Sequence, residues 1–247
     1  MTIHSIQIEA LQLSVIQLVS LIGFVVIADL LLTKFAPLLP AGISQIGALM
    51  ILPIAAGLAY WMAFSFGGTN ELGLTRPDNW LKTLATGVGA GLGVLVAARF
   101  IINPLAIKLF GPWLDPEMFA PLKGQLPQLF INVILISWLH AALCEEIIFR
   151  GFILRWVERL AGGGQGALAL AIIVQAILFG LSHYPQGRTG ILTTTLGGLL
   201  WGGIFLAGGR QLWVVIVGHA TVDTVLFTLA YFGQTRLFLG DAKPETI

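Results

Sequence analysis

The sequence predicts an all-α membrane protein, a polytopic bundle of about seven or eight transmembrane helices. Of its 247 residues, 57% are hydrophobic and only 10% are charged, and the mean hydropathy is +0.91. Soluble domains carry roughly 25% charged residues, so this chain needs lipid to solvate its apolar surface. Lipid requires the backbone to satisfy its own hydrogen bonds. Because no alternating ten-residue barrel pattern appears, we expect helices.

The individual spans can be located from their apolar runs. A helix that crosses the bilayer needs about 20 mostly apolar residues. The residues before the first run include no Lys or Arg, so this run is expected to be an anchor helix and not a cleaved signal. The protein is therefore expected to be an integral, multi-pass protein of the cell membrane. Seven stretches are predicted to span it: Leu11–Leu32, Ile43–Phe66, Leu84–Ile102, Leu129–Phe149, Gly166–Leu181, Ile191–Ala207 and Trp213–Phe232.

Three regions follow from this pattern. Residues 1–125 are expected to hold the N-terminal transmembrane helices and an interfacial segment. Residues 126–235 are expected to form the membrane core, and residues 236–247 a short polar tail. The interfacial segment is Asn103–Gln125, which is rich in proline and charge. Its Trp113 and Phe119 are predicted to lie at the depth of the lipid headgroups.

Charge, cysteine and glycine content narrow the classes of function. The net charge of +1 arises from 13 basic and 12 acidic residues, which gives no reason to expect nucleic acid as a partner. The single cysteine, Cys144, excludes an internal disulfide and a multi-cysteine zinc site. The glycine-rich runs Gly87–Gly93 and Gly197–Gly203 are expected to allow close helix packing, because neither has the form of a phosphate loop. Basic residues divide almost evenly between the two membrane faces and do not set an orientation.

The first polar cluster inside an apolar stretch contains Glu145, Glu146 and Arg150. Ionisable groups in a span are costly and mark functional candidates. Glu146 and Arg150 are four residues apart on one helix face, where they suit an ion pair. Glu145 points about 100° away in a helix of 3.6 residues per turn, so it needs another partner. The alternative reading is an interfacial charged cap. Beyond this cluster, Arg155, Glu158 and Arg159 are expected at a solvated helix end.

Two further clusters place histidines at helical spacing. Phe179 and His183 share one face of the fifth stretch, and a histidine at the membrane surface is the alternative reading there. His219 and Asp223 share one face well inside the seventh stretch, where a purely structural His–Asp pair is the alternative. Two polar groups that face one way in an apolar helix indicate a shared polar cavity.

Together these side chains suggest a hydrolytic site. A carboxylate beside a histidine in a water-poor cavity can act as a general base toward water. Hydrogen-bond donors on the other side of the cavity can stabilise an oxyanion. The residues therefore predict hydrolysis of an amide bond without a covalent nucleophile.

The three clusters resemble the motifs of the CPBP intramembrane glutamic proteases, which include the Rce1 type of CAAX prenyl endopeptidase and bacterial Abi proteins. The sequences EExxxR from Glu145 to Arg150, FxxxH from Phe179 to His183, and HxxxD from His219 to Asp223 agree with that family in order and spacing. The resemblance covers roughly Leu129–Phe232. It implies an intramembrane endopeptidase that acts on a membrane-associated protein or peptide, prenylated or not.

The resemblance also implies a role for each site residue. Glu145 would activate water with His183 as its partner, while Glu146 and Arg150 would hold the geometry and His219 would help to bind the oxyanion. Asp223 departs from the pattern, because the Rce1 type has Asn at this position. An ionised Asp cannot donate a hydrogen bond, so Asp223 is either protonated in the cavity or orients His219.

Several rival readings remain open on the sequence. Zinc could be bound by His183, His219, Glu145, Glu146 and Asp223, although no HExxH helix is present. A dyad of His140 and Cys144 is conceivable, although cysteine is commonly a small buried hydrophobe. The motifs of rhomboid-like serine and presenilin-like aspartic sites do not occur. A transporter or a non-catalytic scaffold could use the same cavity.

The expected partners follow from this interpretation. We predict a protein or peptide substrate at the membrane, contact with the lipid bilayer, and no cofactor and no metal. The predicted catalytic set is Glu145, His183, Glu146, Arg150, His219 and Asp223. The substrate's identity and the oligomeric state are not encoded in these motifs.

Overall fold

A computed structural model describes residues 3–112 and 116–239 of the chain. The structure is 88% helical, and no strand occurs in the described residues. Seven of the helices described are long and apolar enough to cross a membrane, which confirms the predicted fold class. They are Ile8–Leu38, Gly42–Phe66, Trp80–Phe110, Leu126–Leu160, Gly164–Ser182, Tyr184–Ala207 and Leu212–Tyr231.

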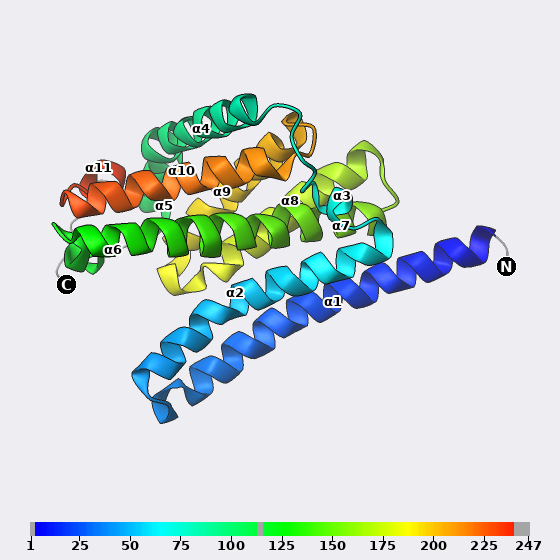
Figure 1. The fold of residues 1–247 in the computed structure, drawn as a ribbon, viewed down its shortest axis with the longest axis horizontal. Coiled ribbons are helices and arrows are strands. Elements are labelled where there is room, and N and C mark those ends of the chain that lie inside the picture. Colours follow the sequence, from blue (N-terminus) through cyan, green and yellow to red (C-terminus); the bar gives the residue numbers. More distant parts are fainter. Residues whose placement is uncertain (1–2, 113–115, 240–247) are drawn as a thin grey trace.

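Most of the spans are built from more than one helical element (Figure 1). In chain order, the elements are α1 Ile3–Phe35, η1 Ala36–Leu38, α2 Ala41–Ala63, η2 Phe64–Phe66, α3 Thr69–Leu72, α4 Trp80–Ala97, η3 Ala98–Ile102, α5 Asn103–Phe110, η4 Pro116–Leu122, α6 Leu126–Ile131, η5 Asn132–Glu145, η6 Ile147–Ile153, α7 Leu154–Leu160, α8 Gly164–Ser182, η7 Tyr184–Gln186, α9 Gly187–Ala207, α10 Leu212–Tyr231 and α11 Arg236–Leu239.

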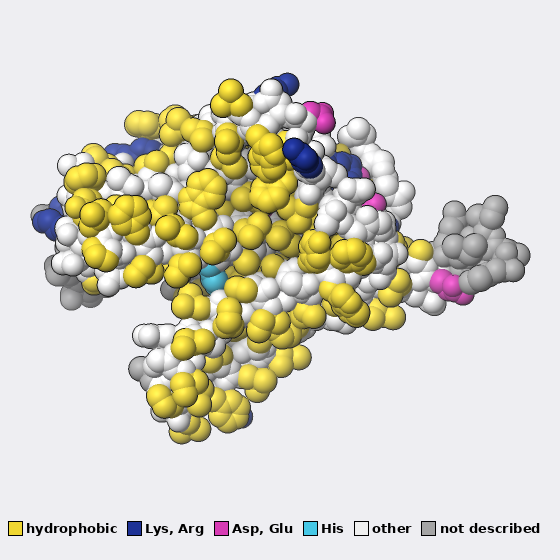
Figure 2. All heavy atoms as spheres, viewed as in Figure 1, with side chains coloured by type: hydrophobic (Ala, Val, Ile, Leu, Met, Phe, Trp, Pro, Cys, Tyr) yellow, Lys and Arg dark blue, Asp and Glu magenta, His cyan; other side chains and the backbone are white. Residues whose placement is uncertain are grey.

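The outer surface of the bundle is apolar. Val19, Trp61 and Phe100 are 64%, 69% and 69% exposed, and hydrophobic side chains cover most of the visible face (Figure 2). Exposed apolar area of this extent is unfavourable in water but is solvated by lipid tails. The protein is therefore an integral, multi-pass membrane protein.

Helix α10 is packed tightly against α4, and it also contacts η5 and α9 (Figure 1). Small residues make the approach of α4 possible, because a Cβ atom on Gly91 would lie 2.5 Å from the carbonyl oxygen of Gly218. A Cβ atom on Gly93, by contrast, would meet open space. The close packing predicted for the first glycine run is confirmed on one face of α4, and this packing fixes the helix that carries His219.

The second glycine run brings α8 and α9 together. A Cβ atom on Gly198 would lie 3.0 Å from the backbone of Ala176, and one on Gly202 would lie 2.9 Å from Nε2 of Gln175. Gln175 is fully buried, and its amide donates to the carbonyl oxygen of Gly198 over 2.9 Å. The predicted close packing is confirmed here too, and it fixes the helix that ends at His183.

The fourth span differs from a regular α-helix. It has π-helical winding over η5 and η6, on both sides of Glu146. The thiol of Cys144 donates to the carbonyl oxygen of Leu139, five residues earlier, over 3.0 Å. π-Helical segments are rare and occur frequently at functional sites. The 100° separation expected for Glu145 and Glu146 assumed α-helical geometry, which this part of the span does not have.

The third span is longer than predicted. The interfacial segment was expected to begin at Asn103, but α5 continues the helix to Phe110. The helix passes through Pro104 directly after the π-helical segment η3, where the regular α-helical bonding is already altered. The side chain of Asn103 is buried and donates to the carbonyl oxygen of Phe238 over 3.2 Å. Phe119 packs near Phe238, while Trp113 and the tail from residue 240 onward lie outside the described residues.

The α1–α2 hairpin is splayed from the other helices (Figure 1). It is linked to α7 by Gln17, which accepts from Nε1 of Trp156 over 2.9 Å, and Gln17 also joins α1 to α2 by donating to the carbonyl oxygen of Met62 over 3.2 Å. Part of α2 packs against η5 and η6. Farther along α1, the hydroxyl of Tyr184 donates to Asp29 over 3.2 Å. Between the hairpin and the other helices the surface is hollowed, and a histidine side chain is exposed at the edge of the hollow (Figure 2).

Candidate active site

The base of the site is a fully buried ion pair. Glu146 and Arg150 are both 0% exposed, and Nη1 of Arg150 lies 2.9 Å from Oε1 of Glu146. This is the pair predicted from the four-residue spacing. The guanidinium of Arg150 also lies over the ring of Phe179, at 4.4 Å from its centroid. A charge pair this deep is stable only while both partners are present.

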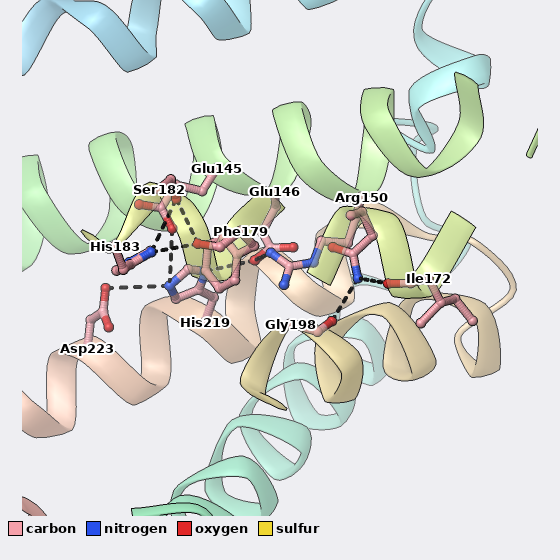
Figure 3. A network of polar contacts seen from close by, with 11 residues as sticks. Glu145, Glu146, Arg150, Ile172, Phe179, Ser182, His183, Gly198, His219 and Asp223 are labelled. Carbon is pink, nitrogen blue, oxygen red and sulfur yellow. Dashed lines mark hydrogen bonds and ion pairs between the residues drawn. The ribbon is translucent and has the colours of Figure 1, made fainter. Parts of the chain in front are cut away.

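The same oxygen of Glu146 also holds His219. Nδ1 of His219 lies 2.7 Å from Oε1 of Glu146 (Figure 3). Since a carboxylate accepts, Nδ1 carries the proton and Nε2 is the nitrogen that faces the other acidic groups. The indole of Trp201 stacks on the imidazole, with centroids 5.9 Å apart and planes at 19°. His219 is thus fixed in one orientation by a hydrogen bond and by stacking.

Glu145 is placed beside Nε2 of His219. Its Oε2 lies 3.9 Å from that nitrogen, and its side chain is 12% exposed. Its carboxylate makes no hydrogen bond within the described part of the chain. The resemblance implied His183 as the partner of Glu145, but the ion-pair contact that the structure places at Glu145 is with His219. Glu145 is therefore accessible and held less tightly than Glu146.

His183 comes from the end of α8, in the turn between two spans. Its Nδ1 lies 2.9 Å from the carbonyl oxygen of Phe179. The carbonyl can only accept, so Nδ1 carries the proton and Nε2 is left free as an acceptor. Burial lowers the pKa of His183 below its ordinary value, and the bond to Phe179 opposes this only in part. The side chain is thus a neutral imidazole near pH 7.

Asp223 lies one turn beyond His219 on α10. Its Oδ2 is 3.8 Å from Nε2 of His219, and its side chain is 23% exposed. The hydrogen bond that orients His219 comes from Glu146, on the opposite edge of the ring. Two roles were left open for Asp223, and one of them was to orient His219. In the structure, Glu146 fills that role. Asp223 lies near Nε2 of His219, the ring nitrogen that does not contact Glu146.

The structure brings all six predicted residues into one cluster (Figure 3). Glu146 and Arg150 lie deepest, whereas Glu145, His183 and Asp223 surround His219 nearer the surface. Trp201 was missed from the sequence, and its only signal was its position between Gly198 and Gly202. Among the described residues, no three His, Cys, Asp or Glu side chains are arranged as a metal-ligand group.

The proposed cysteine dyad has no supporting contact. The buried thiol of Cys144 donates to the backbone of Leu139. His140 bonds the backbone of Leu49, and its Nε2 has no hydrogen-bond partner among the described residues. His140 and Cys144 therefore do not form a nucleophile–base pair in this geometry.

Comparison with known families agrees with the position of these motifs. Residues 127–225 match the family model described as type II CAAX prenyl endopeptidase Rce1-like. This range begins just inside α6 and contains all six residues of the cluster. No curated protein and no solved structure matches the chain.

Proposed function

We propose that this chain hydrolyses a peptide bond of a membrane-associated protein or peptide with water activated by Glu145. The match of residues 127–225 to the Rce1-like model, which describes CAAX-type intramembrane proteases, supports this proposal. The observation that carries the proposal is the division of the cluster into two layers. In the deeper layer, Glu146 of the fully buried Glu146–Arg150 pair bonds Nδ1 of His219. In the outer layer, more accessible polar groups surround Nε2 of His219.

The attacking water is assigned a place between Glu145 and His219. The 3.9 Å between Oε2 of Glu145 and Nε2 of His219 leaves room for one water oxygen about 2.8 Å from each. Glu145 takes a proton from this water as the hydroxide adds to the scissile carbonyl carbon. When the C–N bond breaks, the same proton passes to the amine that leaves.

We assign the oxyanion of the tetrahedral intermediate to the side of the cluster formed by His219. His219 has one proton on Nδ1, which is bonded to Glu146. A second proton on Nε2 would be stabilised by the three nearby carboxylates; it would donate first to the water and, once the water has added to the carbonyl carbon, to the oxyanion. His183 contributes the free Nε2 of a neutral imidazole, so it can accept a hydrogen bond from the second O–H of the water while Glu145 takes the first proton.

Access to the cluster is consistent with a substrate that arrives through lipid. The hollow beside the α1–α2 hairpin is lined by apolar side chains (Figure 2). Tyr184, adjacent to His183, contacts Asp29 of the hairpin across this region. A peptide that carries an apolar segment could reach the site from the bilayer without crossing a polar barrier.

The proposal is tested by mapping new protein termini in cells. Cells with the wild-type protein are compared with cells that carry Glu145→Ala at equal membrane abundance, each with and without a chelator. We expect termini that vanish in the variant and persist with the chelator. Termini that vanish with the chelator would instead indicate a metal site. A phenotype that survives Glu145→Ala, without any change in termini, would indicate a scaffold or a transporter.

A further inference from the structure

A second polar cluster lies around α7, beyond the active site along the fourth span. It is made of Arg155, Arg159 and Glu158 on α7, Glu71 on α3, and Arg210 in the turn before α10. These side chains line or border a surface cavity of about 210 Å³, which Gly163 also lines. Basic and acidic side chains gather at this end of the molecule, near α3 and α7 (Figure 2). The solvated helix end expected here is instead a partly buried network.

The two acidic residues are already occupied by two of the arginines. Arg210 binds Glu158 with two hydrogen bonds, of 2.7 and 2.8 Å. Nη2 of Arg159 donates to Oε2 of Glu71 over 2.8 Å, and its guanidinium lies over the ring of Phe66 at 4.0 Å. Each carboxylate is thus matched with one guanidinium in a strong, charge-assisted geometry.

Arg155 is the one arginine of this cluster that makes no hydrogen bond to either glutamate. Its guanidinium approaches Glu71 and Glu158 only at 3.5 and 4.0 Å, and it donates no hydrogen bond within the described part of the chain. With three arginines and two glutamates, the cluster has an excess charge of +1. Nη1 of Arg159 is also buried without an acceptor among the described residues. The cavity therefore offers several N–H donors and lacks one anion.

The backbone at the start of α8 adds N–H donors, whose partial positive charge reinforces that of the arginines. Gly163 is the residue before α8, a helix of 19 residues, and no side chain caps that helix. The first N–H groups of such a helix have no partner within the helix, and the helix dipole favours an anion there. Gly163 has φ of 75°, a left-handed conformation that glycine adopts without strain. The cavity thus combines guanidinium forks with the start of a helix.

The location of the cavity identifies the kind of anion. It lies where the second, fourth and sixth spans end and the next spans begin, at one face of the membrane. Trp80 and Trp213 begin α4 and α10 at this same face, with ring centroids 5.4 Å apart. Tryptophan at the ends of spans is typical of the headgroup region of a bilayer. The anion most abundant at that depth is the phosphate of a phospholipid.

We propose that Arg155, Arg159, Arg210 and the start of α8 bind a phosphate group, supplied by an anionic lipid headgroup. Arginine matches phosphate because its planar fork donates two parallel hydrogen bonds. The bound phosphate would supply the missing anion for Arg155 and link α7, α8 and the turn before α10. This proposal is independent of the hydrolytic function, because no residue of the active site takes part.

The test is native mass spectrometry of the full-length protein in detergent, titrated with phosphatidylglycerol and with diacylglycerol of the same chains. Diacylglycerol lacks the phosphate, so the difference between the two lipids measures recognition of that group. The variant Arg155→Gln removes the unmatched cation. Arg76→Gln is the control, because it removes an equal charge at the same face. Arg76 is exposed in the segment between α3 and α4.

We expect wild-type protein to bind phosphatidylglycerol in preference to diacylglycerol. We expect Arg155→Gln to weaken this binding about five- to tenfold, and Arg76→Gln to leave it unchanged. Equal binding of both lipids by the wild type would overturn the proposal without recourse to any variant. Equal weakening by both variants would also overturn it, because the effect would then reflect surface charge alone. If inorganic phosphate bound in an Arg155-dependent way and phosphatidylglycerol did not bind, the assignment to a lipid would be overturned. The source would then be free phosphate.

Discussion

Oε1 of Glu146 lies 2.7 Å from Nδ1 of His219 and 2.9 Å from Nη1 of Arg150. One carboxylate oxygen therefore joins the first motif of the site to the third, across two spans far apart in the sequence. The orientation of His219 therefore depends on a residue that is fully buried. Changes to the buried pair must consequently affect both folding and chemistry, whereas changes to Glu145 need affect only chemistry.

Glu145→Gln is expected to lower cleavage by a factor of about 10²–10⁴, since the side chain could no longer take a proton from water. The fold should be retained, because Glu145 is accessible and makes no hydrogen bond in the described structure. Cleavage of a defined peptide and the thermal midpoint in detergent are the measurements. Glu9→Gln, at an exposed position, is the control. A comparable loss of folded protein in Glu145→Gln would show that Glu145 is structural.

Arg150→Ala is expected to cost about 3–5 kcal/mol of stability, because it leaves the charge of Glu146 unpaired in a fully buried position. The double variant Glu146→Leu with Arg150→Met should recover much of this stability, since it removes both charges. It should remain inactive, because Nδ1 of His219 loses its acceptor. Unfolding midpoints and peptide cleavage distinguish the two effects. Recovery of activity in the double variant would contradict the role assigned to the hydrogen bond.

Asp223→Asn is expected to keep activity within about tenfold of wild type. The hydrogen bond that fixes His219 comes from Glu146 and stays in place, while Asn can still donate a hydrogen bond to an oxyanion. The turnover number and KM for one peptide should be measured across a range of pH. A loss as deep as that of Glu145→Gln would instead show that a carboxylate is required at position 223.

Two glycines of α4 offer a matched pair. Gly91→Val would force atoms against the backbone of Gly218 and is expected to cost about 1–3 kcal/mol. It should also lower activity, because α10 carries His219. Gly93→Val adds the same atoms toward open space and should have little effect. Thermal midpoints of the two variants measure the difference. Equal midpoints would contradict the close contact of α4 with α10.

His183 gives a pH dependence of stability with a definite sign. Because burial lowers its pKa from the ordinary value of 6.5 in the folded state, the unfolded chain binds the proton more readily. His183 therefore does not change the free energy of unfolding above pH 6.5. As the pH falls from 6.5 toward the lowered pKa of the folded state, His183 makes the folded protein less stable. The neighbouring Asp223 and the carbonyl of Phe179 limit this effect. His183→Gln should therefore lose less stability than wild type between pH 7 and pH 5, as measured by thermal unfolding. If the thermal midpoints of wild type and His183→Gln fell in parallel with pH, this prediction would be wrong.

Much of the fold was predictable because length and hydropathy alone define a transmembrane helix. The seven spans and the Glu146–Arg150 pair followed from apolar runs and from helical spacing. The π-helical winding around Glu146 had no signal in the sequence, because it depends on packing against the neighbouring helices. The extension of the third span through Pro104 was missed for a related reason, since the π-helical segment η3 that precedes this proline had no signal in the sequence either.

The motifs of the site were predictable, but their pairing was not. Spacing shows which side chains share a face of one helix, and it does not show which face of another helix lies opposite. For this reason the contact of Glu146 with His219 was not foreseen. The same limit applies to Trp201, whose position between two packing glycines gave no indication that its ring would lie on His219.

The attachment of the α1–α2 hairpin has a mechanical consequence. Gln17 and Trp156 link the hairpin to α7 near one face of the membrane. Beyond them, α2 packs against η5 and η6, His140 bonds Leu49, and Tyr184 bonds Asp29 near the end of α1. Segments with few buried contacts open at low free energy, and a change in bilayer thickness tilts a span that does not match it. We expect the far end of the hairpin to exchange its amide hydrogens faster than α10. The thickness of the surrounding membrane would then set how widely the protein is open.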